Sequence, residues 1–248
     1  MSGIGREFIE KTKYQHLGKS DQSKGFPQPP LESEYDKTKP VTDLPPPDEI
    51  IVPNMDLREA IERRRSIRNY SREPLTMEEL SYLLWCTQGV QEVTTGERTQ
   101  RTVPSGGGRH VFETYLLINN VSDLRPGLYR FLAVDHKLVE IRVAADTADM
   151  ITEGCLGQPI VKTCAATFIW AAVPYRVTWR YGERGYRYML LDAGHICQNL
   201  YLAAESIGGG VCAVGAFSDD DINRLLNLDG EEQFVIYGAT VGKKVKLP

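Results

Sequence analysis

The order of the predicted helices and strands indicates an α+β fold, in which a mixed sheet lies between helices in a three-layer α/β/α arrangement. Residues 163–173 are almost wholly apolar, as in a strand that is buried on both faces. Residues 186–207 carry apolar side chains at spacings of three and four, which predicts one helix of about 22 residues that is central or lies at a subunit interface. The helices and strands do not alternate regularly, so a doubly wound parallel sheet is not expected.

The composition is that of an ordinary globular protein. The 248 residues are 42% hydrophobic and 25% charged, with a formal net charge of −4, which favours neither nucleic acid nor a membrane surface as a partner. The longest apolar stretches fall short of the roughly 20 residues that span a bilayer. Residues 1–19 lack the apolar core of a secretory signal. We therefore expect a cytoplasmic protein.

The five cysteines and four histidines show no spacing typical of metal ligands. The cysteines are widely separated, stand in apolar contexts and form no C-x-x-C pair, so we expect reduced core residues. Cys212 in particular is interpreted as a packed small residue. His195 lies on the long predicted helix, and we expect a hydrogen-bonded interior histidine there rather than a catalytic base. No metal site is predicted.

Prolines indicate a division of the chain near residue 53. Residues 1–53 carry eight prolines and little periodic hydrophobicity, which predicts an extended N-terminal arm. This arm is either a disordered tail or a segment that wraps a partner subunit, and its scattered apolar side chains favour wrapping slightly. Residues 54–248 form the predicted globular domain.

Local signals place the elements of this domain. Asp56 can cap a first helix, and Thr76 with Glu79 forms a capping box for a second helix that ends near Gly89. Residues 96–108 are polar, glycine-rich and not periodic, so they are predicted to form a long loop. The remaining predictions are a strand at 111–119, a hairpin of strands at 127–134 and 137–143, a short helix at 147–156, a strand at 211–214, a helix from the cap Ser218 to Leu226, and a closing strand at 233–241.

The first candidate for chemistry is the run Arg64-Arg65-Ser66-Ile67-Arg68, where the first helix breaks into a turn. In an extended or turning backbone Arg64, Ser66 and Arg68 point to one side. They can then present two guanidinium groups and a hydroxyl to one phosphate. A run of charges is more often a solvated surface, so the spacing alone leaves both interpretations open.

The second candidate is Pro104-Ser105-Gly106-Gly107-Gly108. Three consecutive glycines allow a planar ring or a phosphate to approach the backbone closely, and they leave amides free to donate. The segment matches neither a P-loop nor a dinucleotide-binding fingerprint. Taken by itself, a flexible surface loop is the simpler interpretation.

The third candidate is Ala213-Val214-Gly215-Ala216-Phe217, where a predicted strand leads into a capped helix. Backbone amides at such a junction are unpaired and are positioned to hold an acceptor atom. The alternative is that Gly215 only shapes a turn.

Taken in order, these segments resemble the flavin-dependent nitroreductases. The stretch RRSIRNYSREPLTMEELSYLL (64–84) is similar to the opening signature of that family. Four further segments resemble its azoline (thiazoline/oxazoline) dehydrogenase-like, or SagB-type, branch: RTVPSGGGRHVFETYLLIN (101–119), GLYRF (127–131), YGERGYRYMLLDAGHICQNLYLAAESIGGG (181–210) and VGAFSDDDINRLLNLDGEE (214–232). The resemblance covers nearly the whole chain from residue 56, and TKYQH (12–16) is similar to the leader of that branch.

The resemblance implies a nitroreductase-like fold and a homodimer that holds two FMN molecules at the subunit interface. It assigns the FMN phosphate to Arg64, Ser66 and Arg68, with Arg65 beside them, and adds Lys243 or Lys244 to complete the clamp. It assigns the ring and ribityl chain to the partner's loop, which consists of Pro104, Ser105, Gly106, Gly107 and Gly108. It places Val214, Gly215 and Ala216 beside the ring, with the amides of Gly215 and Ala216 near flavin N5 as the catalytic groups.

The sequence departs from the family pattern in two places, which bear on the substrate more than on FMN. The glutamate often found beside the N5 amide is not present at 215 or 216, and the usual PSAGA-type loop reads PSGGG. The implied function is ping-pong electron transfer from NAD(P)H to a small acceptor. The alternatives are dehydrogenation of thiazoline or oxazoline rings in a modified peptide and, in a different class, flavin binding without turnover.

Overall fold

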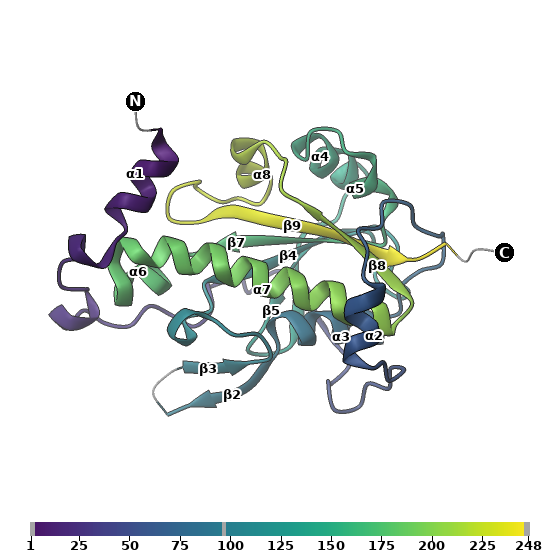
Figure 1. The fold of residues 1–248 in the computed structure, drawn as a ribbon. Coiled ribbons are helices and arrows are strands. Elements are labelled where there is room, and N and C mark those ends of the chain that lie inside the picture. The colour runs from purple at the N-terminus through teal and green to yellow at the C-terminus, as the bar shows by residue number, and fades with distance from the viewer. Residues whose placement is uncertain (1–2, 96–97, 246–248) are drawn as a thin grey trace.

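The chain folds around a seven-stranded sheet with helices on both faces (Figure 1). The computed structural model describes residues 3–95 and 98–245. The strand order is β1-β6-β5-β4-β7-β9-β8. These strands are β1 (Val41–Asp43), β4 (Phe112–Ile118), β5 (Gly127–Leu132), β6 (Lys137–Arg142), β7 (Ala166–Ala172), β8 (Gly209–Val214) and β9 (Phe234–Lys243). The predicted α+β fold with a sheet between two layers of helices is confirmed.

The sheet is antiparallel, whereas the sequence predicted a mixed one. Every strand pair of the seven-stranded sheet is antiparallel within the described residues. Parallel pairing is limited there to the isolated bridges Ser66–Val211 and Leu75–Val121. The reason lies in the connections, because the links between β4, β5 and β6 are too short for a crossover and so join antiparallel neighbours.

Each face of the sheet is covered by its own group of helices (Figure 1). On one face lie α2 (Leu57–Arg63), α3 (Met77–Gln88) and α7 (Gly185–Ser206), and on the other lie α4 (Thr147–Gly154), α5 (Pro159–Thr163) and α8 (Asp219–Leu225). The strands β4 and β7 are buried along their whole length, because both faces are covered. The core therefore consists of two apolar layers with the sheet between them.

The long predicted helix is present as α7, and it is central. Its residues Ala193, Cys197 and Leu200 are buried against the sheet, as their spacing predicts. The chain's own core thus covers most of the apolar stripe. The exposed large apolar residues of α7 are Leu190 and Leu191, whose exposed fractions are 50% and 59%.

Two of the three predicted helix caps are confirmed, whereas Ser218 stands at the N-cap of α8 but its hydroxyl donates to the Asp221 carboxylate and accepts from no amide of the helix. The carboxylate of Asp56 accepts from the Glu59 amide at the start of α2, and Thr76 and Glu79 form the complete capping box at the start of α3. These caps depend on a few adjacent residues, which is why the sequence could predict them.

The prediction of a loop at 96–108 is wrong for the first part of that range. The strands β2 (Val90–Thr94) and β3 (Arg98–Arg101) form an antiparallel hairpin there, and Gly96 lies outside the described residues. The strands have mostly polar, exposed side chains, so they lack the alternation of apolar residues by which strands are predicted. Further elements that were not predicted are β1, α5, α1 (Ile4–Lys11), α6 (Tyr175–Tyr181) and the 3₁₀ turns η1 (Tyr14–His16), η2 (Gln22–Lys24), η3 (Gly106–Gly108) and η4 (Gly182–Arg184).

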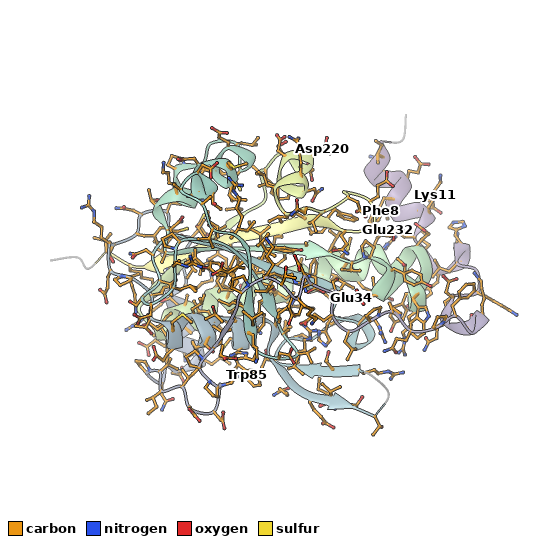
Figure 2. All side chains as sticks on the ribbon, turned by 180° about the vertical axis from the view of Figure 1, so that it is seen from behind. Phe8, Lys11, Glu34, Trp85, Asp220 and Glu232 are labelled. Carbon is orange, nitrogen blue, oxygen red and sulfur yellow. The ribbon has the colours of Figure 1, made fainter. Side chains whose placement is uncertain are left out.

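The N-terminal arm packs along its own subunit and is not extended throughout. It begins with α1 and ends with β1, which pairs with β6 at the edge of the sheet. Seen from behind, Phe8 and Lys11 lie at one end of the molecule and Glu34 lies nearer its middle (Figure 2). Wrapping of a partner subunit, and the division of the chain at residue 53, remain predictions.

Buried side chains of the body hold the proline-rich part of the arm by donating to its carbonyl groups. Arg176 Nε donates to Pro30 O at 3.0 Å, and Trp179 Nε1 donates to Phe26 O at 3.0 Å. In the same way an Arg130 amino group donates to the carbonyl of Ser33 at 2.7 Å. Because proline has no amide hydrogen, this stretch is anchored through its acceptors.

A buried ion pair between Arg176 and Glu113 lies beneath the arm. The Nη2–Oε1 distance is 2.5 Å, and the side chains are 3% and 4% exposed. The Glu113 carboxylate also accepts from the Ser33 amide at 2.8 Å. Burial alone would raise the pKa of Glu113, but Arg176 and Arg130 outweigh it and hold the pKa below its ordinary value.

We expect Glu113→Ala to lower the free energy of unfolding by about 3–5 kcal/mol, because it leaves the Arg176 guanidinium buried without a carboxylate. Urea unfolding at neutral pH measures this difference. The matched control is Asp149→Ala, which removes an exposed pair with Lys162 and should change the free energy by less than about 1 kcal/mol. An equal loss in both variants would contradict the prediction.

The same pair gives a pH dependence. Since the pKa of Glu113 is lowered from 4.5, its stabilising contribution is complete above pH 4.5 and is lost as the pH falls through the pKa of the folded state. The difference between wild type and Glu113→Ala should therefore shrink below that pH.

Candidate functional site

Arg64, Ser66 and Arg68 lie on an extended segment that follows α2 and runs beside β8. Ser66 forms a parallel bridge with Val211, and the Ile67 amide donates to the Val211 carbonyl at 2.9 Å. Arg68 is exposed and makes neither a hydrogen bond nor an ion pair with another described residue. The segment is thus fixed through its backbone, which leaves the Arg68 guanidinium available to a ligand.

Tyr201 of α7 connects this segment to β8. Its hydroxyl lies 3.0 Å from Ser66 Oγ and accepts from the Ala213 amide at 2.9 Å. The guanidinium carbon of Arg64 lies 5.3 Å from the centre of the Tyr201 ring, a cation–π distance. Arg64 and Ser66 thus contact the same tyrosine, and the placement of Arg68 on the same side of the segment stays a prediction. No sequence pattern indicates Tyr201, which is one aromatic residue in a largely apolar helix.

Arg65 points elsewhere. Its guanidinium donates to the carbonyl of Glu62 at 2.9 Å and to its own neighbour's carbonyl, that of Arg64, at 2.8 Å. These acceptors belong to the last turn of α2, where carbonyl groups lack helical partners. Arg65 therefore helps to end the helix in this structure.

The end of β8 presents two free amides. Val214 is buried, whereas Gly215 and Ala216 are exposed, and their amides donate to no other described residue. The turn is nevertheless held, because Gln158 Nε2 donates to the Ala216 carbonyl at 2.7 Å. The Gly215 and Ala216 amides lie four and five residues along the chain from Val211, or about 13 and 17 Å in extended backbone. The predicted unpaired donors are present at this junction.

Lys243 and Lys244 approach the arginine segment through the backbone, but their ammonium groups bind carboxylates of their own chain. The Ser71 amide donates to the Lys243 carbonyl at 2.9 Å. Lys243 pairs with Glu79, and Lys244 Nζ lies 2.6 Å from Glu205 Oε2. Both lysines line a cavity of about 390 Å³. The positive charge of the two lysines is therefore partly neutralised, in contrast to that of Arg68. No sequence pattern predicts these ion pairs.

The glycine loop, defined as residues 104–108, is attached to another part of α7. Ser105 Oγ donates to Asp192 Oδ2 at 2.6 Å, and the Gly106 amide donates to Asp192 Oδ1 at 3.0 Å. Asp192 precedes Tyr201 by nine residues, or about 13 Å along the helix. The structure therefore does not bring the glycine loop together with the arginine segment of the same chain.

The conformation of the glycine loop requires glycine. Gly107 has a φ of +66°, and a Cβ built there would lie 2.3 Å from the hydroxyl oxygen of Tyr181. A Cβ on Gly106 would lie 2.9 Å from Cβ of Tyr188. The expectation of a flexible loop with several free amides is thus corrected, because the residues form the 3₁₀ turn η3 and the Gly108 amide donates to the Ser105 carbonyl. The Gly107 amide donates to no other residue in the part of the chain that the structure describes.

The arm reaches the aromatic residues that pack on the glycine loop. The hydroxyl groups of Tyr14 and Tyr188 lie 2.6 Å apart, and the Arg184 guanidinium carbon lies 4.7 Å from the Tyr14 ring. The Tyr181 and Tyr188 rings meet edge to face at 4.9 Å. The stretch TKYQH therefore lies next to the candidate site.

The remaining chemistry-bearing residues add no second site. His195 is exposed, which corrects the prediction of an interior histidine; it lies four residues from the exposed Leu191 and so shares its face of α7. All five cysteines are free, and Cys212 is buried as predicted. Within residues 3–95 and 98–245, no three His, Cys, Asp or Glu side chains are grouped to hold a metal ion. No helix in those ranges is long and apolar enough to cross a membrane.

Comparison with protein families and curated proteins agrees with the resemblance seen in the sequence. Residues 61–243 match the model of the nitroreductase family. The chain is 33% identical over 201 residues to a protein of Methanocaldococcus jannaschii named as a nitroreductase, and the match covers 80% of this chain and 98% of that protein. It is 30% identical over 154 residues to the trifolitoxin-processing protein TfxB of Rhizobium leguminosarum bv. trifolii, over 60% of this chain and 41% of TfxB.

Solved structures show the same fold. A crystal structure from Ralstonia eutropha, named as a nitroreductase, has a TM-score of 0.68 and 25% identity over 90% of this chain and 100% of that chain. One from Anabaena variabilis has a TM-score of 0.64 and 30% identity over 77% of this chain and 38% of that chain. The Escherichia coli microcin synthetase complex McbBCD has a TM-score of 0.61 and 19% identity over 79% and 75%. The chain thus spans less than half the length of TfxB and of the Anabaena chain.

Proposed function

The chain belongs to the nitroreductase family, and from this we propose that it is an FMN-dependent oxidoreductase that passes electrons from NAD(P)H to a small acceptor in a ping-pong cycle. The observation that carries the proposal is that Tyr201 connects two donor sets from distant parts of the chain. The Tyr201 hydroxyl ties Ser66 to Ala213, and the free amides of Gly215 and Ala216 follow at the end of β8.

The residues of the two donor sets fit FMN, which has a phosphate at one end and a ring with acceptor atoms at the other. Arg64, Ser66 and Arg68 offer two guanidinium groups and a hydroxyl, the donors that bind phosphate well. The exposed amides of Gly215 and Ala216 are donors without a partner among the described residues. A phosphate would therefore find the guanidinium groups of Arg64 and Arg68 beside the Ser66 hydroxyl, which contacts Tyr201, and a ring acceptor would find the two free amides.

Bound FMN would supply the two-electron chemistry, while the protein positions it and adjusts its electrostatics. In this proposal the amides of Gly215 and Ala216 would lie beside flavin N5 and, as donors, would stabilise negative charge on the ring. Buried Val214 fixes the start of the turn that carries them. Lys243 and Lys244 add positive charge near the phosphate, reduced by their pairs with Glu79 and Glu205.

We also propose a homodimer in which the partner's glycine loop lines the ring and ribityl chain. Two observations support it. The glycine loop is held by Asp192, which precedes Tyr201 by about 13 Å along α7, so the loop and the arginine segment of one chain are attached to different parts of the helix. The exposed Leu190 and Leu191 leave an apolar part of α7 for a partner to cover.

The dimer is tested by light scattering at micromolar concentration. We expect the wild type to have the mass of two chains and Leu191→Glu to shift toward one chain, because a carboxylate would be buried in the interface. Leu156→Glu is the control, since Leu156 is 62% exposed, close to the 59% of Leu191, and lies beside α4 on the other face of the sheet. A wild-type monomer that still holds FMN would contradict the proposal.

A second candidate function is dehydrogenation of thiazoline or oxazoline rings in a modified peptide. The similarity to TfxB, a trifolitoxin-processing protein, favours it. Turnover by the protein alone would favour the reductase, whereas strict dependence on a cyclodehydratase partner would favour the peptide dehydrogenase. Flavin binding without turnover, the alternative from a different class, requires both activities to be absent.

The first test is the visible absorption spectrum of the purified protein before and after anaerobic NADPH or NADH. We expect flavin bands that bleach with one of the two donors. Flavin bands that persist would move the assignment to the peptide dehydrogenase or to a flavin-binding protein without turnover. A colourless protein that cannot be reconstituted with FMN would refute the proposal.

Arg68→Ala tests the phosphate site. We expect FMN binding to weaken by about 1–3 kcal/mol, the value of a charge-assisted hydrogen bond, because the free guanidinium of Arg68 is lost. The dissociation constant is measured from flavin fluorescence. Arg58→Ala removes an exposed arginine paired with Glu62 on α2 and should leave the constant unchanged. Unchanged affinity of the Arg68 variant would remove this residue from the site.

A further inference from the structure

Asp192 is a nearly buried carboxylate whose hydrogen bonds go to the glycine loop. The residue is 3% exposed. One oxygen accepts from Ser105 Oγ at 2.6 Å, and the other accepts from the Gly106 amide at 3.0 Å. No lysine, arginine or histidine forms an ion pair with it in the described residues. Among the described residues, Asp192 therefore accepts hydrogen bonds from the glycine loop and not from a cationic side chain.

The hydrogen bonds continue beyond Asp192 and fix both ends of the turn. Ser105 Oγ, while donating to Asp192, accepts from the His110 amide at 2.9 Å. On the other side, Gly106 and Gly107 pack against Tyr188 and Tyr181 so closely that neither position has room for a Cβ. The glycine loop therefore lies between a carboxylate that pulls it onto α7 and two rings that limit how it can move.

A carboxylate in this position costs stability. Burial raises the pKa of Asp192, and the bonds from Ser105 and Gly106 oppose that rise without cancelling it. A neutral side chain of similar shape would avoid the cost of burying a charge. The Asp192 carboxylate is thus better explained by the hydrogen bonds that it accepts from the glycine loop than by a contribution to the stability of the core.

We propose that Asp192 is a positioning residue that holds the glycine loop in the shape that receives the partner's flavin. This inference rests on the proposed FMN function and extends it to a residue that does not touch the cofactor. By engaging Ser105 and the Gly106 amide, Asp192 leaves the Gly107 amide as the unused donor at the centre of the glycine loop. Loss of the carboxylate releases the turn and lowers FMN affinity in the dimer.

Three measurements on the same variants test this, and one of them is the midpoint of urea unfolding. Hydrogen–deuterium exchange of the peptide that contains residues 104–110, in flavin-free protein, reports whether the turn is held. Flavin fluorescence gives the FMN dissociation constant of the reconstituted protein. The variants are Asp192→Ala, Asp192→Asn and the control Asp149→Asn, which changes an exposed aspartate of α4.

For Asp192→Ala we expect faster exchange in residues 104–110 and an FMN dissociation constant about tenfold higher, because two hydrogen bonds to a charged acceptor are lost. For Asp192→Asn, which keeps one oxygen acceptor, we expect intermediate values with an unfolding midpoint equal to or above that of the wild type. The control should match the wild type in all three readouts. If Asp192→Ala does not fold, the Asn variant decides.

Unchanged exchange or an unchanged dissociation constant in the Asp192 variants would overturn the proposal, while FMN binding by the wild type would leave the proposed function standing. A parallel fall in unfolding midpoint and FMN affinity in the Asn variant would assign Asp192 a purely structural role and would also overturn it. A wild type that binds no FMN would refute the proposed function itself.

Discussion

The packing of α7 against one face of the sheet sets the geometry on which the candidate site depends. The helix carries Asp192, which holds the glycine loop, and Tyr201, which ties the arginine segment to β8. A helix of this length behaves as a rigid spacer, so the two attachments keep a fixed separation of about 13 Å. Burial of the helix against the sheet keeps that spacer in place, and its uncovered side, with Leu190 and Leu191, remains available for association.

The cationic side chains around α7 and the sheet differ in whether they have an acidic partner. In the body, Arg176 is paired with Glu113 beneath the arm, and Lys243 and Lys244 are paired with glutamates near the end of β9. Arg68 stands apart, because the structure gives it no acceptor among the described residues. Buried pairs of this kind are costly to break, whereas an exposed unpaired guanidinium can bind an anion without first losing a partner. This contrast ranks Arg68 above the two lysines as an anchor for phosphate.

The parts of the fold that depend on neighbouring residues were predictable, and the parts that depend on distant ones were not. The periodicity of α7 and the caps at Asp56 and Thr76 are local, and the structure contains them. The β2–β3 hairpin is polar, and the arm is ordered by side chains far along the chain, so neither has a local signal. The prediction of a mixed sheet was wrong, because the direction of β9 between β7 and β8 depends on pairing between distant residues, for which there is no local signal.

The candidate site divides in the same way. The arginine segment and the amides at the end of β8 follow from sequence motifs and backbone geometry. Asp192 and Tyr201 act through partners 86 and 135 residues away, so their roles appear only in three dimensions. His195 was misplaced because the periodicity of α7 fixes which residues are apolar, but not which of the remaining residues face solvent.

The position of β9 bears on the order in which the site assembles. The strand β8 lies at the edge of the sheet and joins it through β9, the last strand along the chain. Until that strand has been synthesised, β8 has no partner strand in the sheet, and the bridge between Ser66 and Val211 has no fixed support. During synthesis the arginine segment leaves the ribosome well before β9. It therefore reaches its final conformation only after β9 has been synthesised and has joined the sheet.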